Sequence, residues 1–277
     1  MTLKLHRALL GLALLGLHGL SGAEVPAATA EALMHKSGVW AQLGDVAAQV
    51  KAGMAQSMQA DGLDDEDVER LNALADSAFS AERLRTSFLQ VLSQRATPAD
   101  SASALKWYDS PSGKAMTALE EASSASFDDM NRVMAEGNQA LAKASAKRQT
   151  LLSQTVKATR AVEGMVTLQI HTAVAVLQGV AKVVPNQPQL PAADLRKAFE
   201  AQRPQMVASS LGVALSMFAL TYQSASDKAL AQYVKFLSSK SGAALILTME
   251  EALDASLSSA AEALGIGIPK TPGTLSL

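Results

Sequence analysis

The sequence predicts an all-α protein of two tandem, related helical halves, with about five helices each, packed as a helical bundle. About one residue in five is alanine, which favours helices, and the alternation of apolar and polar residues that marks strands is missing. Apolar residues instead recur at three- and four-residue steps, as in Leu43, Val46, Val50, Met54 and Met58, which places them on one helical face. The nine prolines stand mostly at the edges of such runs.

The first residues predict export from the cytoplasm. Lys4 and Arg7 form a basic start, Ala8–Leu20 is an uncharged apolar run, and Ser21–Ala23 offers the small residues that a signal peptidase requires. The apolar run is too short for a stable membrane span, so an uncleaved anchor is the less favoured alternative. We therefore expect residues 1–23 to be a cleaved signal peptide and the mature protein to be periplasmic.

The periodicity then predicts ten helices. They span residues 28–60, 65–78, 80–95, 98–109, 111–136, 146–183, 192–202, 204–224, 226–238 and 240–264. They form a first helical half at 24–140 and a second at 141–264. The remaining residues, 265–277, contain two prolines and three glycines near the chain end and are expected to be a flexible tail.

Residue types mark several of the helix starts. Pro98, Pro111 and Pro204 stand at the beginning of predicted helices, where a missing N–H costs nothing. The acidic run Asp64–Asp67 introduces the helix at 65–78 and complements its dipole. This run lacks the alternating ligands and the central glycine of a calcium-binding loop, so a helix start is the favoured interpretation.

Two matches between the halves predict an internal duplication. Leu105–Met116 aligns with Val234–Leu245, with Lys, Ser, Ser, Gly and Ala identical in register and 129 residues between the copies. Upstream, the residues Gly44, Val46, Gln49, Val50 and Met54 match Gly164, Val166, Gln169, Ile170 and Val174 at a spacing of 120. The added residues fall mostly in the proline-rich connection Val184–Pro191, where an insertion is tolerated.

The repeated motif has a local physical explanation. Its residues are Trp107, Tyr108, Ser110, Pro111 and Gly113 in the first copy, and Phe236, Ser239 and Gly242 in the second. The serine is expected to cap the following helix, and the glycine to allow close approach of a neighbouring helix. A phosphate-binding loop is excluded because Ala115 replaces the required hydroxyl residue and a helix, not a strand, precedes the motif.

At this motif the chain resembles a known family. A secretory leader followed by helices with a Trp-Tyr-x-Ser-Pro-x-Gly-Lys corner is similar to the bacterial envelope family called domain of unknown function 2059. The first copy fits the motif well, whereas the second lacks the tyrosine and the proline. The resemblance implies a periplasmic helical protein, and it implies no activity, cofactor or catalytic residue.

Composition excludes several function classes. The absence of cysteine excludes disulfide scaffolds, thiolate zinc sites and cysteine nucleophiles. A formal net charge of −2 argues against nucleic-acid binding, which needs a basic face. His35 and His171 have no neighbouring ligands at metal-binding spacing, and His171 is expected in the core or in an interface. We therefore expect no metal, no cofactor and no catalytic residue, although a Ser–Lys pair stays open.

Acidic pairs are the best candidates for an enzymatic site. They follow the motif copies, as Glu120, Glu121, Asp128 and Asp129 in the first half and as Glu250, Glu251 and Asp254 in the second. Two such carboxylates could flank a glycosidic bond or hold a divalent ion. Solvated helix faces are the favoured interpretation, and a carboxylate-dependent hydrolase of cell-wall glycan is the alternative.

The second half carries more apolar surface than the first. Pro204–Ser226 contains no charged residue, and Gly164–Ala181 is also free of acidic residues, lysine and arginine. We expect a buried central helix at 204–224 rather than a membrane span, and no stable span after signal cleavage. The surplus apolar surface predicts a core, a homodimer interface or a ligand pocket.

These observations favour a non-enzymatic binding or assembly factor of the bacterial cell envelope, acting on an unknown envelope protein. The first alternative is a periplasmic carrier of a lipid or another apolar ligand. The glycan hydrolase is the second alternative, and the fold class alone does not choose among the three.

Overall fold

The computed structural model describes residues 24–61, 63–124, 130–184 and 191–268, and all regular elements in these ranges are helices. The helices are α1 (Ala27–Lys36), α2 (Val39–Asp61), α3 (Asp65–Ala78), α4 (Ala81–Arg95), α5 (Pro98–Asp109), α6 (Pro111–Ser124), α7 (Met130–Lys143), α8 (Ala146–Ala158), α9 (Ala161–Ala181), α10 (Ala192–Glu200), α11 (Arg203–Thr221), α12 (Asp227–Leu237) and α13 (Lys240–Gly267). The protein is therefore an all-α helical bundle, as the sequence predicts. The predicted signal peptide and the last nine residues lie outside the described ranges.

Two long helices predicted from the sequence are each broken by one residue with a positive φ. The helix predicted over 28–60 divides into α1 and α2 at Gly38, where φ is +80°. The helix predicted over 146–183 divides into α8 and α9 at Arg160, where φ is +54°. A residue in the left-handed region cannot continue a right-handed α-helix, so each of the two predicted helices is interrupted there. The prediction of two continuous helices was therefore wrong.

The largest of the remaining differences from the prediction is the division between α6 and α7. The helix predicted over 111–136 is described as α6, which ends at Ser124, and α7, which begins at Met130 and continues to Lys143. At the end of the chain α13 continues through Gly267, so the first residues of the predicted tail are helical.

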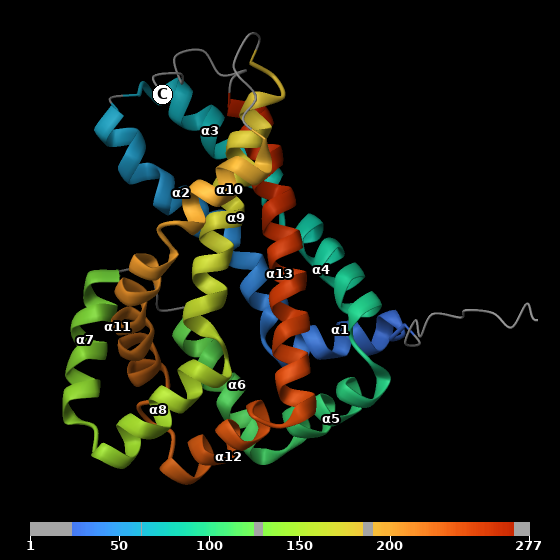
Figure 1. The fold of residues 1–277 in the computed structure, drawn as a ribbon, viewed down its shortest axis with the longest axis vertical. Coiled ribbons are helices and arrows are strands. Elements are labelled where there is room, and N and C mark those ends of the chain that lie inside the picture. The colour runs from blue at the N-terminus through green and yellow to red at the C-terminus, as the bar shows by residue number, and fades with distance from the viewer. Residues whose placement is uncertain (1–23, 62, 125–129, 185–190, 269–277) are drawn as a thin grey trace, which may run out of the picture.

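Helices α9 and α13 form the centre of the bundle and lie side by side along most of their length (Figure 1). Their backbones come into direct contact at Gly179 and Gly265. A Cβ atom on Gly265 would lie 2.2 Å from the carbonyl oxygen of Val176, and one on Gly179 would lie 2.2 Å from that of Glu262. Glycine is required at this crossing because any side chain would separate the two helices.

One hydrophobic core contains residues from both predicted halves. Leu33 and Phe88 from the first half belong to the same buried cluster as Leu230 and Leu264 from the second. Helices α4 and α5 pack on α13, whereas α6 and α7 pack on α12 and α11. Within the halves, α1 contacts α2, α4 and α5, and α8 makes the corresponding contacts with α9, α11 and α12. The last helices of each half are therefore packed on the other half.

Helix α11 is less buried than the sequence predicts. Its fully buried residues are small, namely Ser210, Ala214, Ser216 and Ala219, and Leu211 is 46% exposed. It packs on α7 where a Cβ on Gly137 would lie 2.4 Å from the Ser216 carbonyl oxygen. The stretches Ala146–Ala181 and Arg203–Thr221 are long and apolar enough to cross a membrane by length and composition alone. The first of them is broken at Arg160.

Candidate functional site

The first motif copy forms the corner between α5 and α6. The Ser110 hydroxyl accepts a hydrogen bond from the Gly113 N–H at 3.0 Å and donates one to the Trp107 carbonyl oxygen at 2.6 Å. Pro111 is the first residue of α6. A Cβ atom on Gly113 would lie 2.1 Å from the Trp107 carbonyl oxygen, so only glycine permits this tight corner. This is the serine-capped corner that the sequence predicts.

The second copy builds the same corner between α12 and α13. The Ser239 hydroxyl accepts from the Gly242 N–H at 3.1 Å and donates to the Phe236 carbonyl oxygen at 2.6 Å. A Cβ on Gly242 would lie 2.0 Å from that same carbonyl oxygen. The corner therefore keeps its geometry without the proline of the first copy.

The two corners meet through their aromatic residues. The ring centroids of Trp107 and Phe236 are 4.9 Å apart with an interplanar angle of 8°, and Trp107 also stacks on Tyr233 at 5.9 Å. Tyr108 contacts Phe236 edge to face at 6.1 Å. The sequence predicts each corner separately but does not predict that the two copies are in contact.

A groove of about 680 Å³ lies over this aromatic stack, and we call it the signature groove. It is lined by Ser103, Lys106, Trp107, Ser110, Pro111, Ser112, Gln232, Lys235, Phe236 and Ser239. Four pairs of lining residues are separated by the 129 residues of the motif alignment: Ser103 and Gln232, Lys106 and Lys235, Trp107 and Phe236, Ser110 and Ser239. Corresponding residues of the two corners and of the helices before them thus line one groove.

The electrostatics of the signature groove are set by two lysines. Lys106 and Lys235 are both exposed, and neither makes an ion pair within the part of the chain that the structure describes. The nearby carboxylates have other partners. A hydrogen bond from Ser241 lowers the pKa of Asp100, and the ammonium group of Lys36 lowers the pKa of Asp109. The two lysines are therefore available to an anionic ligand.

Polar side chains and one indole complete the groove. The Ser112 hydroxyl donates to the Gln232 side-chain oxygen at 2.6 Å and so links α6 to α12. The indole nitrogen of Trp107 is buried without a hydrogen-bond partner among the described residues. The sequence alignment contained a usable signal for this site, because the lysine is identical in both motif copies.

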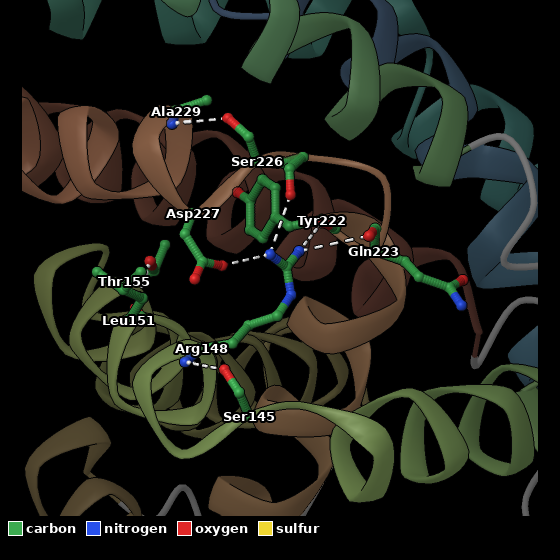
Figure 2. Close-up of polar contacts among 10 residues, drawn as sticks. Ser145, Arg148, Leu151, Thr155, Tyr222, Gln223, Ser226, Asp227 and Ala229 are labelled. Atoms are coloured by element: carbon green, nitrogen blue, oxygen red, sulfur yellow. Dashed lines mark hydrogen bonds and ion pairs between the residues drawn. The ribbon is translucent and has the colours of Figure 1, made fainter.

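Arg148 on α8 positions the wall formed by α12 (Figure 2). Its guanidinium donates to the carbonyl oxygens of Tyr222 and of Ala225, the latter at 2.9 Å, and to the Asp227 carboxylate at 2.8 Å. These groups lie between the end of α11 and the start of α12. Because one planar cation satisfies several carbonyl groups there, it fixes the direction in which α12 leaves α11. The sequence pattern does not indicate this positioning role of Arg148.

Glu120 is half-buried behind the groove, and its interpretation as part of a solvated face was wrong. One of its carboxylate oxygens accepts hydrogen bonds from the hydroxyl groups of Tyr222 at 2.5 Å and Tyr233 at 2.7 Å. Burial raises the pKa of Glu120, and the two hydrogen bonds act in the opposite direction. Burial also raises the pKa of both tyrosines. Tyr233 in turn stacks on Trp107, so this network supports the groove floor.

The other candidate carboxylates have separate partners. Glu250 pairs with Arg160 at 2.8 Å, Glu251 lies 3.7 Å from Arg95, and Asp254 contacts His171 at 2.8 Å. Glu121 is exposed and lies beside Gly38, and Asp128 and Asp129 lie outside the described residues. In the described ranges, no group of three or more histidine or acidic residues could hold a metal ion.

The two histidines lie in different environments. The Nδ1 atom of His171 contacts the carboxylate of Asp254, which joins α9 to α13, and the imidazole is 24% exposed. His35 is stacked on Trp40 with ring centroids 4.4 Å apart. His171 therefore lies at the interface of the two central helices.

Comparison with known proteins locates the family resemblance. No curated protein and no solved structure matches the chain. The matching family model covers residues 82–150, which include the first motif copy and Arg148. Over these residues the chain is similar to the family described as "Uncharacterized protein conserved in bacteria (DUF2059)", which confirms the resemblance carried by the motif.

Proposed function

We propose that the protein is a non-enzymatic binding factor of the bacterial cell envelope whose signature groove holds an acidic segment of a partner protein. The observation that carries this proposal is the pair Lys106 and Lys235, which line the groove from α5 and α12 without ion-pair partners among the described residues. Between them lie the stacked rings of Trp107 and Phe236. Cations beside an aromatic floor favour a ligand that combines negative charge with an apolar side chain.

The dimensions and polar groups of the groove suit a short peptide. A volume of about 680 Å³ accommodates a few residues. A central apolar side chain would cover the aromatic floor, and carboxylates on either side would meet the lysines. Ser112 and Gln232 supply hydroxyl and amide groups of the kind that bind peptide backbone. The interaction would be of modest affinity because the lysines are exposed to solvent.

A binding role is also favoured by the distribution of the acidic residues. Glu120 is held by two tyrosines, and Glu250, Glu251 and Asp254 each contact a different basic residue or histidine. Among the described residues, these contacts do not bring two carboxylates together in one cleft, as a glycosidase requires. A periplasmic location follows only from the signal-peptide pattern of residues 1–23, and it is part of this proposal.

Titration of the mature protein with a defined peptide tests the groove. The probe is N-acetyl-Glu-Phe-Glu-amide, and the readout is the indole N–H signal of Trp107 in a heteronuclear NMR spectrum, assigned with Trp40→Phe. We expect a saturable shift of the Trp107 signal and little effect of the matched peptide Lys-Phe-Lys. Replacing both Lys106 and Lys235 by methionine should weaken binding at least about tenfold.

Equal binding of the acidic and basic peptides, or a shift that survives the double lysine replacement, would contradict the proposal. The hydrolase alternative has its own test, the release of soluble fragments from purified peptidoglycan. Release that is lost in both Glu120→Gln and Glu121→Gln would replace the binding role with an enzymatic one.

A further inference from the structure

We infer that a second groove, between α8, α12 and α13, binds the head group and chain of a single-chain anionic amphiphile such as a fatty acid. This groove has a volume of about 520 Å³ and is lined by residues that include Lys157, Val234, Leu237, Ser238 and Leu247. It lies on the face of α12 that the signature groove does not use. The inference is independent of the proposed peptide site and gives the carrier alternative a defined location.

One of the two cations that line this groove has no ion-pair partner among the described residues. In the first half Lys36, near the end of α1, pairs with Asp109 at the end of α5. The motif alignment places Ser238 at the position of Asp109. Lys157, near the end of α8, lines the groove with Ser238 and makes no ion pair with any described residue. The groove therefore presents an unneutralised ammonium group, and it is also lined by Ser238, which stands where the first motif copy has a carboxylate.

The same comparison shows why the ligand should have an apolar chain. The alignment places Leu247 opposite Ala118, so the first half has only a methyl group at this position. Leu247 is 46% exposed and is one of three large apolar side chains exposed to this degree among the described residues. Val234 and Leu237 line the same groove, so its lining combines apolar side chains with a cation. A carboxylate at Lys157 and a hydrocarbon chain on these apolar side chains satisfy both features.

Arg160 is the second cation of this groove, and Glu250 neutralises its charge. Arg160 adopts the left-handed conformation that Gly38 adopts between α1 and α2. An arginine in this conformation is strained, whereas a glycine is not. Its Nε donates to Glu250 at 2.8 Å, which leaves Lys157 as the unpaired cation of the groove.

The inference is tested on the mature protein by methyl-selective NMR of its leucine and valine residues. The two ligands to be compared are decanoate, which is anionic, and decyltrimethylammonium, which is cationic. We expect decanoate to shift the methyl signals of Val234, Leu237 and Leu247, and decyltrimethylammonium to bind at least about fivefold more weakly. Lys157→Gln should weaken decanoate binding about fivefold. Ser238→Asp, which restores the carboxylate of the first half, should weaken it about tenfold by adding repulsion.

Asp109→Ser is the matched control, since it makes the reciprocal change in the first half and should leave decanoate binding unchanged. Equal binding of the two amphiphiles, or unchanged affinity in both Lys157→Gln and Ser238→Asp, would overturn the inference. Shifts confined to Leu43 and Leu168, which line a different cavity, would also overturn it. None of these outcomes affects the Trp107 signal that reports on the signature groove.

Discussion

The indole of Trp107 lies nearly parallel to the ring of Phe236, with the ring centroids 4.9 Å apart. These residues hold the same position in the two motif copies, 129 residues apart in the sequence. The copies are therefore in direct contact, and the floor of the signature groove requires both of them. Loss of either ring would affect the packing between α5 and α12 as well as the groove.

Replacing Trp107 by alanine tests the structural contribution of this stack. We expect Trp107→Ala to lower the free energy of unfolding by about 3 kcal/mol, because it removes a large ring that packs on two aromatic side chains. Trp107→Phe keeps a stacked ring and should lose less than half as much. Urea denaturation followed by circular dichroism measures both values. An alanine variant as stable as the phenylalanine variant would show that the stack contributes little.

Replacing Arg148 should destabilise the fold and also change the groove. Arg148→Met removes the partner of carbonyl groups at the end of α11 and leaves the Asp227 carboxylate unpaired. We expect a loss of about 2–4 kcal/mol in the free energy of unfolding. The neighbouring Lys147→Met is the control, because Lys147 is exposed and should change the stability by less than about 0.5 kcal/mol. Similar losses in the two variants would contradict the positioning role.

Glu120 predicts a defined pH dependence of stability. Because burial raises its pKa above the ordinary value of 4.5, the folded protein binds this proton more tightly than the unfolded chain does. The stabilising contribution is complete below the unfolded pKa and is lost as the pH rises through the folded pKa. Glu120→Gln does not titrate and keeps an oxygen that can accept from Tyr222 and Tyr233.

The free energy of unfolding of Glu120→Gln, relative to the wild type, should therefore increase as the pH rises from about 4 to 7. Urea denaturation at a series of pH values measures this difference. Parallel pH profiles for Glu120→Gln and the wild type would show that Glu120 titrates normally.

The local features of the fold could be predicted from the sequence because they depend on neighbouring residues. Ser110 and Gly113 belong to one short segment, and helix capping requires little more than that segment. The break at Gly38 had a visible signal in the glycine itself. The break at Arg160 did not, since a long charged side chain rarely has a positive φ.

Contacts between distant segments could not be predicted in the same way. The acid pair Glu120 and Glu121 looks equivalent in the sequence, yet tertiary packing places only Glu120 against two tyrosines. The hydropathy of α11 predicts burial, whereas its neighbours cover mainly its small residues. The signature groove combines both cases, because its corners are local and their contact is tertiary.

Two glycines in helices should respond in opposite directions to the same substitution. A Cβ on Gly265 would lie 2.2 Å from the Val176 carbonyl oxygen and 3.1 Å from the Gly179 Cα, so α9 and α13 would have to separate. We expect Gly265→Ala to lower the free energy of unfolding by about 3 kcal/mol. Gly212, within α11, has nothing within 4 Å of its Cβ position. Gly212→Ala should therefore raise the free energy of unfolding by about 0.5–1 kcal/mol through helix propensity.

Urea denaturation of the two alanine variants checks this pair, and the sign of each change is the decisive result. A stable Gly265→Ala variant would mean that α9 and α13 are not in backbone contact at this point. Destabilisation by Gly212→Ala would mean that this exposed face of α11 is covered in solution, since an added methyl group costs stability only where another surface opposes it.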